Sequence, residues 1–317
     1  MPLSWDGGQV GKQQGLHSQM SVLVLGASSQ IGYFYLRRLQ LMGRQVLAVS
    51  RRPREDSADG LVQWLVADIQ QLPAKVGLEA VVSFGPLVGL AAWLARLEVA
   101  PASKLVATSS MSVVTKRGSV VAAERDLVGC LAEGEQALRE QCQRLGMRCT
   151  VLRPTIVYGA GRDRSLTPLA RRAMRCRVFA LPSGSGWRQP VHADDIALAV
   201  ERCLQRDLPE DLVLELGGGE RISANQMFRR VHDALPARVL LLSVPGAVLR
   251  LAASALPAIR GPVSRLSMDL VADNSRLTSL LGFEPRAFDL EPWMLGVGEQ
   301  WQDRLSAQPL RLAQRSS

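Results

Sequence analysis

Residues 22–32 read VLVLGASSQIG, a run of strand-forming residues that breaks at a glycine and continues into a helical stretch. Gly26 permits a tight turn, and Gly32 permits the close approach of the helix to the strand, as a dinucleotide-binding turn requires. The N-terminus of such a helix faces the pyrophosphate and favours its negative charge. Ser29 replaces the middle glycine of the usual three, so the motif alone also fits an ordinary strand-to-helix turn, and the rest of the chain decides.

The composition is that of a globular protein. The chain has 317 residues, of which 47% are hydrophobic and 21% are charged, and its net charge is +9. Of the 38 basic residues, 34 are arginines, and they are spread along the chain instead of clustering beside aromatic residues. This distribution favours a solvated surface and an anionic small-molecule ligand over nucleic acid as a partner.

The cysteines form no CxxC pair, and their odd count leaves at least one thiol unpaired. They are Cys130, Cys142, Cys149, Cys176 and Cys203. No signal peptide precedes them. This pattern predicts a reduced, cytoplasmic protein with no disulfide and no metal site.

Strand-like runs alternate with helical stretches through the first half of the chain. The strand-like runs lie at 21–25, 45–50, 62–67, 79–84, 104–109 and 148–153. The helical stretches lie near 30–43, 87–98 and 123–146. This order is typical of βαβ units, in which helices cover both faces of a parallel sheet. It supports a dinucleotide-binding turn at residues 22–32 and predicts an α/β fold.

Beyond residue 155 the alternation loosens, and we expect the second half to pack over the carboxyl edge of the sheet, where doubly wound folds bind ligands. Within it, the adjacent Asp194 and Asp195 are expected to start a helix as a cap and a dipole partner, and Ser223 to cap another helix. The predicted divisions are a disordered leader at 1–19, a dinucleotide-binding core at 20–160, a substrate-binding part interleaved with the last core elements at 161–305, and a flexible tail at 306–317.

Residues 238–262 form the most apolar stretch, but Arg250 and several prolines and glycines interrupt it. No apolar run approaches the roughly 20 residues of a membrane span, so no transmembrane segment is predicted. We expect a packed amphipathic helix here. The alternative is a surface that makes peripheral contact with a membrane or with an apolar substrate.

Several segments, in order, resemble the extended and atypical short-chain dehydrogenase/reductase families, which include nucleotide-sugar epimerases and dehydratases. The segments are GASSQIG at 26–32, ADI at 67–69, VATSSMSVV at 106–114, LRPTIVYGAGRD at 152–163, RQPVHADDIALAV at 188–200, LGGGERIS at 216–223 and VADNSRLTSLLGFEPRAF at 271–288. The resemblance covers nearly all of residues 20 to 290. It implies a Rossmann-like doubly wound parallel sheet with a smaller, mixed C-terminal part that binds the substrate.

The resemblance also implies which residues hold a nicotinamide dinucleotide. Those expected at the pyrophosphate are Gly26, Ser28, Ser29, Gln30, Ile31 and Gly32. Those expected beside the adenine are Asp68 and Ile69. Those expected along the cofactor and around the nicotinamide are Phe84, Gly85, Pro86, Thr108, Pro154, Thr155, Ile156 and Val157.

The end of the second strand bears on the choice between NAD and NADP. An acidic residue there would accept hydrogen bonds from a free ribose 2′-hydroxyl. This chain instead has Ser50, Arg51 and Arg52, which offer donors and positive charge to a 2′-phosphate. NADP is therefore favoured over NAD, while the alternative for the same residues is a solvated basic loop.

The proton-transfer residues of these families are only partly present. Ser110 matches their serine and is the candidate catalytic residue, but Leu127 and Leu131 occupy the positions of the tyrosine and the lysine. A leucine side chain cannot carry a proton. Four other titratable groups near these positions are better explained as helix-terminal charges or small buried residues: Glu124, Asp126, Cys130 and Glu133.

On the substrate side, the resemblance implies that Arg188 contacts the diphosphate of a nucleotide sugar and that Arg162 lines the same cleft. His192 is expected to make a structural hydrogen bond. Two functions remain open. One is an NAD(P)-binding protein that acts on a nucleotide-sugar or apolar carbonyl substrate without the Tyr-xxx-Lys pair. The other is a non-catalytic NADPH-binding protein with a structural or redox-sensing role. The sequence sets neither the substrate nor the oligomeric state.

Overall fold

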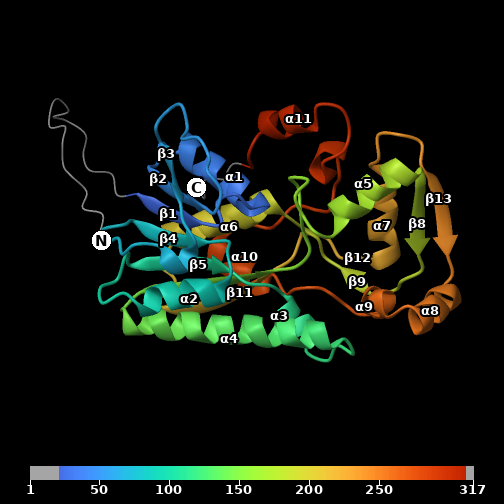
Figure 1. Cartoon of the computed structure of the whole chain (residues 1–317), viewed down its shortest axis with the longest axis horizontal. Helices are drawn as coiled ribbons and strands as arrows, with labels where there is room; N and C mark the ends of the chain where they lie inside the picture. The colour runs from blue at the N-terminus through green and yellow to red at the C-terminus, as the bar shows by residue number, and fades with distance from the viewer. Residues whose placement is uncertain (1–20, 312–317) are drawn as a thin grey trace.

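The computed structural model describes residues 21–311 (Figure 1). The predicted leader at 1–19 lies outside the described residues, as do residues 312–317 of the predicted tail. The described chain forms a seven-stranded sheet flanked by helices at one end and a smaller mixed part at the other (Figure 1). The predicted Rossmann-like α/β fold is therefore confirmed.

The large sheet contains the six predicted strands and one strand from the second half. They are β1 (Val22–Leu25), β2 (Val46–Ser50), β3 (Val62–Val66), β4 (Ala80–Ser83), β5 (Lys104–Thr108), β6 (Arg148–Pro154) and β11 (Asp211–Leu216). All pairs are parallel, in the order β11-β6-β5-β4-β1-β2-β3. The order reverses between β1 and β4, which is the switch point where doubly wound sheets bind ligands.

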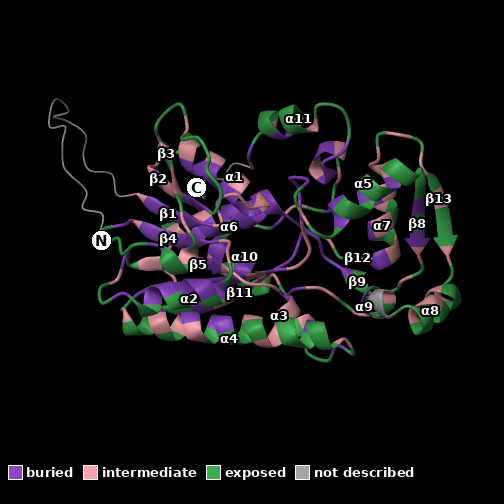
Figure 2. Ribbon diagram, viewed as in Figure 1, coloured by how far each residue is buried: buried purple, intermediate pink, exposed green. Residues whose placement is uncertain are grey.

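Helices cover both faces of this sheet because its strands are apolar on both sides. In β1, Val22 and Val24 belong to one buried cluster, and Leu23 and Leu25 belong to the other. The first face is covered by α1 (Gln30–Leu41), α6 (Ala193–Gln205) and α10 (Ser275–Leu281), and the second by α2 (Leu87–Ala95) and α4 (Ala122–Arg144). Buried residues concentrate in these layers (Figure 2).

The smaller part is held together by a third apolar cluster, which includes Tyr158, Phe179, Met227 and Phe288. Its strands are β7 (Val157–Tyr158), β8 (Val178–Pro182), β9 (Trp187–Arg188), β10 (Val191–His192), β12 (Ile222–Ser223) and β13 (Leu240–Val244). They pair as β7 with β10, β9 with β12, and β8 with β13. The remaining helices are η1 (Ile69–Gln71), α3 (Ser112–Thr115), α5 (Leu166–Cys176), α7 (Ala224–Asp233), α8 (Gly246–Ala255), α9 (Pro257–Arg265), η2 (Pro292–Leu295) and α11 (Trp301–Ala307).

Residues 238–262 do not form the predicted packed helix. They contain β13, α8 and most of α9, with Pro245 between β13 and α8. Proline lacks the N–H that an interior helical position uses, so the apolar run is divided. No residue of α8 is buried. Among residues 21–311, no helix combines the length and apolar character needed to cross a membrane.

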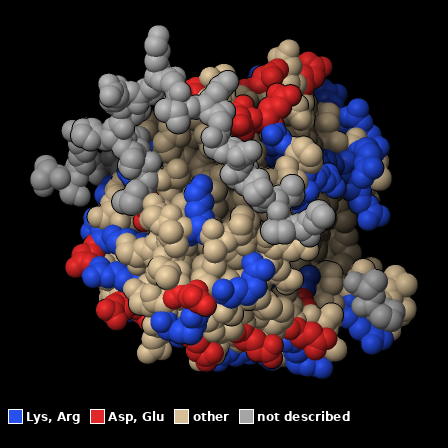
Figure 3. Space-filling view, turned by 60° about the vertical axis from the view of Figure 1, so that its left-hand side comes forward, with Lys and Arg blue, Asp and Glu red and all other residues tan. Residues whose placement is uncertain are grey.

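Lys and Arg side chains lie among Asp and Glu side chains along the lower rim of the face in Figure 3, and a further group lies at its right-hand edge. On this face, negative side chains interrupt the positive ones along the rim. This mixture agrees with the spread of the arginines along the sequence.

Asp194 and Asp195, in the first turn of α6, are buried and paired with arginines from distant parts of the chain. Arg38 of α1 lies 2.7 Å from one oxygen of Asp194, and Arg286 lies 2.7 Å from the other and 2.9 Å from Asp195. The backbone N–H of Arg311 also donates to Asp194, at 3.0 Å. Burial acts to raise the pKa of Asp194, but these charges and the N–H outweigh it and hold the pKa below its ordinary value.

His192 is the N-cap of α6, so the predicted aspartate cap is wrong. Its Nδ1 accepts a hydrogen bond from the backbone N–H of Asp194 at 3.1 Å, which confirms the structural role predicted for the histidine. An accepting Nδ1 must be unprotonated. Burial, together with the charge of Arg286, lowers the pKa of His192 to about 3. Ser223 caps α7 as predicted, in a capping box with Gln226.

We expect His192→Asn to remove part of the pH dependence of stability. The unfolded histidine binds a proton near its ordinary pKa of 6.5, whereas the folded one does so only near 3. Protonation therefore favours the unfolded chain as the pH falls through 6.5, and the wild type should lose about 2 kcal/mol between pH 7 and pH 5 from this group. Asparagine can also cap the helix but does not titrate. Urea denaturation of both proteins at the two pH values measures the difference, and equal slopes would contradict it.

Candidate functional site

A cleft of about 880 Å³ lies at the carboxyl ends of the parallel strands, which is ample for a small-molecule ligand. Its walls include residues at the ends of β1, β2, β4, β5 and β6. The second half contributes residues 162–165, together with Arg265 and Leu270. The prediction that the second half packs over this edge of the sheet is therefore confirmed.

The turn between β1 and α1 forms one wall and depends on two glycines. Gly26 has φ +67°, and a Cβ there would lie 2.8 Å from the carbonyl carbon of Phe84. A Cβ on Gly32 would lie 2.4 Å from the carbonyl oxygen of Ala27. Ser29, at the middle position of the three-glycine fingerprint, is the N-cap of α1, and its Oγ accepts a hydrogen bond from the N–H of Gly32 at 3.0 Å. The serine therefore supplies a cap where the usual fingerprint has a glycine.

Gln30 lies at the first turn of α1 and lines the cleft. Its Nε2 donates to the carbonyl of Val157 at 3.1 Å, while its Oε1 is buried without a hydrogen-bond partner among the described residues. A buried, unpaired amide oxygen is an acceptor that a hydroxyl or N–H group of a ligand can satisfy. The close-packed glycine turn and the N-terminus of α1 beside it fit the pyrophosphate of a dinucleotide.

The end of β2 forms the adenine side expected from the sequence. Ser50 and Arg51 line the cleft, as does Asp68. The Ser50 Oγ accepts a hydrogen bond from the N–H of Arg52 at 3.2 Å, but the Arg52 side chain is exposed and is not part of the cleft wall. Asp68 caps η1 by accepting from the N–H of Gln70 at 3.0 Å. Residues 50–52, where β2 ends, are Ser, Arg and Arg and include no carboxylate.

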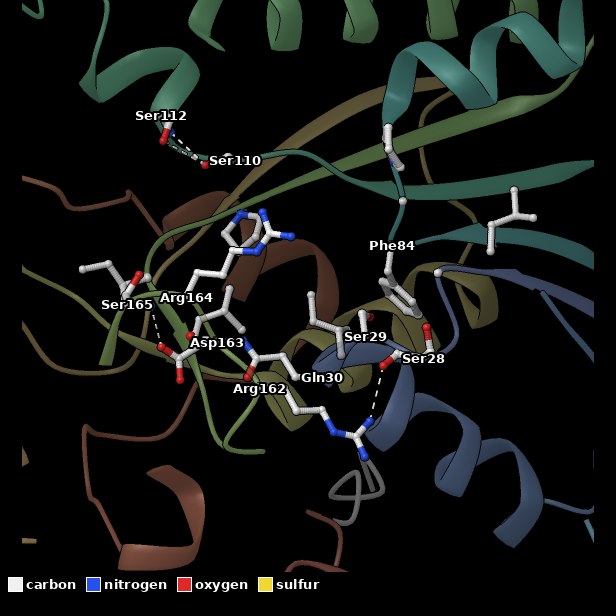
Figure 4. Close-up of a pocket in the computed structure, with 18 of the residues that line it drawn as sticks. Ser28, Ser29, Gln30, Phe84, Ser110, Ser112, Arg162, Asp163, Arg164 and Ser165 are labelled. Atoms are coloured by element: carbon white, nitrogen blue, oxygen red, sulfur yellow. Dashed lines mark hydrogen bonds between the residues drawn. The ribbon is translucent and has the colours of Figure 1, made fainter. Parts of the chain in front are cut away.

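Ser110 lies after β5 on the opposite side of the cleft (Figure 4). Its Oγ donates to the Oγ of Ser112 at 3.1 Å and accepts from the N–H of the same residue at 3.1 Å. Lys116, at the end of α3, lines the same wall. Burial and the charge of Arg265 lower the pKa of Lys116. A hydroxyl and an ammonium group are therefore available to hold or move a proton here.

Glu124 is buried behind this wall and pairs with both cations. Its carboxylate accepts from Ser119 Oγ at 2.6 Å, lies 3.6 Å from Lys116 Nζ and pairs with Arg265. Glu124 thus serves as a counter-ion. The other groups considered in α4, Asp126, Cys130 and Glu133, are exposed.

Leu127 and Leu131 lie on α4, and neither is among the residues that line the cleft. Tyrosine is also missing from its wall among the described residues. Tyr35 and Tyr158 are buried, and the ring of Tyr33 packs against Arg162. Burial raises the pKa of both Tyr35 and Tyr158 above the ordinary value. The described cleft therefore contains no phenol for proton transfer.

Arg162 and Arg164 reach the cleft from the loop before α5 (Figure 4). Arg162 donates to the carbonyl of Ser28 at 3.3 Å, and its guanidinium lies 5.1 Å from the ring centre of Tyr33. Desolvation and the like charge of Arg54 lower the pKa of Arg162. Arg162 is thus beside the glycine turn, at the pyrophosphate end. Arg164 lies between Ser110 and Gln30 in the view of Figure 4.

Arg188 lies outside the residues that line the cleft. It is 3% exposed, and its guanidinium donates to the carbonyls of Trp187 at 2.9 Å, Met268 at 2.7 Å and Arg265 at 2.5 Å. These bonds secure the chain after α9, and burial lowers the pKa of the guanidinium. Contact between Arg188 and a substrate stays a prediction.

Most of the residues expected at the cofactor line this cleft, and Gly32, Arg52 and Thr108 do not. The cleft residues with polar or charged side chains that the sequence did not indicate are Ser112, Thr115, Lys116, Asp163, Arg164, Ser165 and Arg265. Their only signal was nearness in sequence to a matched segment, as for Lys116 after VATSSMSVV. Arg265 had no such signal, because it lies at the end of α9, a helix that begins within the apolar stretch 238–262, where one packed helix was expected.

Fold and cleft together define a doubly wound α/β protein with a cleft at the switch point of its parallel sheet. Residues 132–216 match the model of the NAD dependent epimerase/dehydratase family. This segment runs from α4 to β11 and includes the LRPTIVYG and VHADDIA motifs. The family resemblance predicted from the sequence is confirmed by this match. No curated protein matches the chain in sequence.

Solved epimerases and dehydratases share the fold. MoeE5 in complex with UDP-glucuronic acid and NAD has a TM-score of 0.68 at 20% identity, over 90% of this chain and 99% of that one. The NAD-dependent NDP-hexosamine 5,6-dehydratase TunA has a TM-score of 0.65 at 18% identity, over 90% and 98%. UDP-glucuronic acid 4-epimerase from Bacillus cereus has a TM-score of 0.65 at 14% identity, over 85% of this chain and 94% of that one. At these identities the likeness establishes the fold.

We expect Gly26→Ala to destabilise the chain more than Gly43→Ala. Both glycines have positive φ, at +67° and +66°, so both alanines carry the same backbone strain of about 1 kcal/mol. A Cβ on Gly43 meets nothing within 4 Å, whereas one on Gly26 meets the backbone of Phe84 at 2.8 Å. The collision should cost about 1–3 kcal/mol more. Guanidinium denaturation compares the two variants, and equal losses would show that the turn is not closely packed.

Proposed function

We propose that the chain binds NAD(P) together with a nucleotide-sugar-like or apolar carbonyl substrate. The observation that carries this proposal is the charge of the cleft. Among residues 21–311, five basic and two acidic side chains line the cleft. Both acidic side chains accept hydrogen bonds from backbone N–H groups at the start of a helix. The basic side chains are Arg51, Lys116, Arg162, Arg164 and Arg265. An excess of positive charge in a concave site favours ligands with several negative charges.

The dinucleotide would lie across the switch point of the sheet. The N-terminus of α1 would hold its pyrophosphate, with Arg162 closing over the same group from the other side. Phe84 to Pro86 and Pro154 to Val157 would line its path toward the nicotinamide. Bound there, the group supplies a ring that accepts or donates a hydride. The residues of the chain orient it and exclude water from it.

The substrate end is separate from the glycine turn. Lys116, Arg164 and Arg265 bring cationic groups from three different elements to that end, where Glu124 pairs with Lys116 and Arg265, and Asp163 is next to Arg164. A diphosphate between nucleoside and sugar would match this set. The solved structures with this fold include complexes with UDP-glucuronic acid and UDP-glucose, which supports the same ligand class for this chain.

NADP is proposed over NAD because the end of β2 carries Ser50 and Arg51 beside the cleft, with Arg52 next to it. We expect the double variant Arg51→Ala/Arg52→Ala to weaken NADPH binding by about tenfold or more and NADH binding by much less, since each arginine contributes a charge-assisted bond to the 2′-phosphate. Isothermal titration calorimetry measures both. The control Arg276→Ala/Arg304→Ala removes two exposed charges away from the cleft and should change neither. Equal losses for NADPH and NADH would contradict the preference.

A second function has its own support. Leucines stand at the tyrosine and lysine positions, and the described cleft holds no tyrosine, which favours a non-catalytic NADPH-binding protein. The enzymatic reading depends on Ser110 and Lys116 instead. The Ser110 hydroxyl would hold the substrate oxygen, and the half-buried Lys116 would hold or move the proton.

We expect Ser110→Ala to lower kcat/KM by about a hundredfold if the chain is an enzyme, because such a hydroxyl acts on the transition state. Turnover is followed by chromatography of UDP-glucose and UDP-glucuronic acid and by the absorbance of the reduced nicotinamide with aldehyde substrates. The control Ser109→Ala removes a neighbouring buried hydroxyl that does not line the cleft. Tight NADPH binding with no turnover of any of these compounds would favour the non-catalytic function. The absence of any nucleotide binding would overturn both.

A further inference from the structure

The part of the chain farthest from the large sheet exposes an apolar surface that the cleft does not use. It consists of the outer face of β8 and β13 and the outer side of α8, and we call it the β13–α8 surface. Its members are Val178, Ala180, Leu240, Leu242, Val248 and Leu251. β13 and α8 lie at the same end of the molecule and carry no buried residue (Figures 1 and 2).

The strand part of this surface is apolar where a solvated sheet face is normally polar. β8 alternates regularly, with Phe179 and Leu181 buried and the side chains between them exposed. The register places Leu240 beside Val178 and Leu242 beside Ala180. Leu240 is 60% exposed and Leu242 is 47% exposed. Phe179 and Leu181 are buried because they lie on the inner face of this two-stranded sheet, whereas no described residue covers Leu240 and Leu242 on its outer face.

The helical part continues the same character. In α8, Val248 is 53% exposed and Leu251 is 73% exposed, and they are three residues apart, on one side of the helix. Leu256, directly after α8, is 56% exposed. Large apolar side chains that gather on a strand and the following helix differ from the single exposed leucines of an ordinary surface.

The segment that carries β13 and α8 has charged side chains of one sign. Residues 234–268 contain no Asp or Glu and contain Arg238, Arg250, Arg260 and Arg265. Arg177 adds a further exposed guanidinium at the start of β8. Within the described residues, Arg177, Arg238 and Arg250 form no ion pair. The nearest acid in sequence, Asp233, pairs with His232.

We propose that the β13–α8 surface binds the surface of a membrane containing anionic phospholipids. Such a membrane offers an apolar layer for the leucines and negative headgroups for the arginines. A second copy of the chain is a poorer occupant, because a symmetric dimer would bring the same unpaired arginines against one another. The proposal does not depend on the function proposed above.

The test is co-sedimentation of the full chain with vesicles. We expect binding to vesicles of mixed phosphatidylcholine and phosphatidylglycerol that is at least about tenfold tighter than binding to phosphatidylcholine alone, and that weakens with added salt. Leu251→Asp should weaken it by about tenfold or more. Leu41→Asp is the matched control, because Leu41 is also helical and is 74% exposed, against 73% for Leu251, and it should bind as the wild type does.

Arg238→Ala/Arg250→Ala gives a second measurement, with an expected loss of about fivefold for each arginine on the mixed vesicles. The control Arg276→Ala/Arg304→Ala should lose much less. Melting curves establish that each variant is folded, which the exposure of these side chains favours. Absence of binding to the mixed vesicles by the folded wild type would overturn the proposal, as would equal losses for Leu251→Asp and Leu41→Asp. So would a dimer in gel filtration that Leu251→Asp converts to a monomer.

Discussion

The buried carboxylates Asp194 and Asp195 are the constraint on which the arrangement of the two halves depends. They sit in the first turn of α6, where the helix dipole already favours negative charge. Arg38 approaches them from α1, and Arg286 and Arg311 approach from segments near the C-terminus. A buried charge of this kind is tolerated only when it is fully paired, so all four segments must meet in one geometry. That geometry sets the smaller part beside the large sheet.

His192 extends this constraint to the cleft. As the N-cap of α6 it accepts from Asp194, and its ring packs edge to face against Tyr158 at 5.1 Å between centroids. β10, which ends at His192, pairs with β7, and residues 159–165 follow directly from β7. The loop that carries Arg162 and Arg164 is therefore placed by the same core that anchors α6. The position of the cationic cleft wall and the stability of the domain have a common origin.

The two ends of the cleft carry different chemical groups. One end has the close-packed turn, in which Gly26 and Gly32 leave no room for a side chain. Its other end holds Ser110 and Lys116 but no phenol among the described residues. Binding and chemistry use different residues at such sites, so a cleft can keep the first while the second changes. The cations from α3, α9 and the loop before α5 still mark the second end as a site for an anion.

The sequence by itself determined the parallel sheet, the glycine turn and the cap at Ser223, whereas it placed the cap of α6 on an aspartate instead of His192. These features depend on local spacing and on residue type, which are printed in the chain. Tertiary structure alone decided where three arginines lie. Arg162 lies at the glycine turn, Arg188 donates to three backbone carbonyls, and Arg265 reaches the cleft. It also decided that no other element covers α8. An arginine side chain is long and its partners lie far away in sequence, at separations of 134 residues for Arg162 and 77 for the bond from Arg188 to Arg265. Hydrophobic periodicity and secondary-structure propensity describe residues that are neighbours along the chain. The direction of an arginine side chain and the burial of a helix depend instead on the distant segments that the fold places beside them.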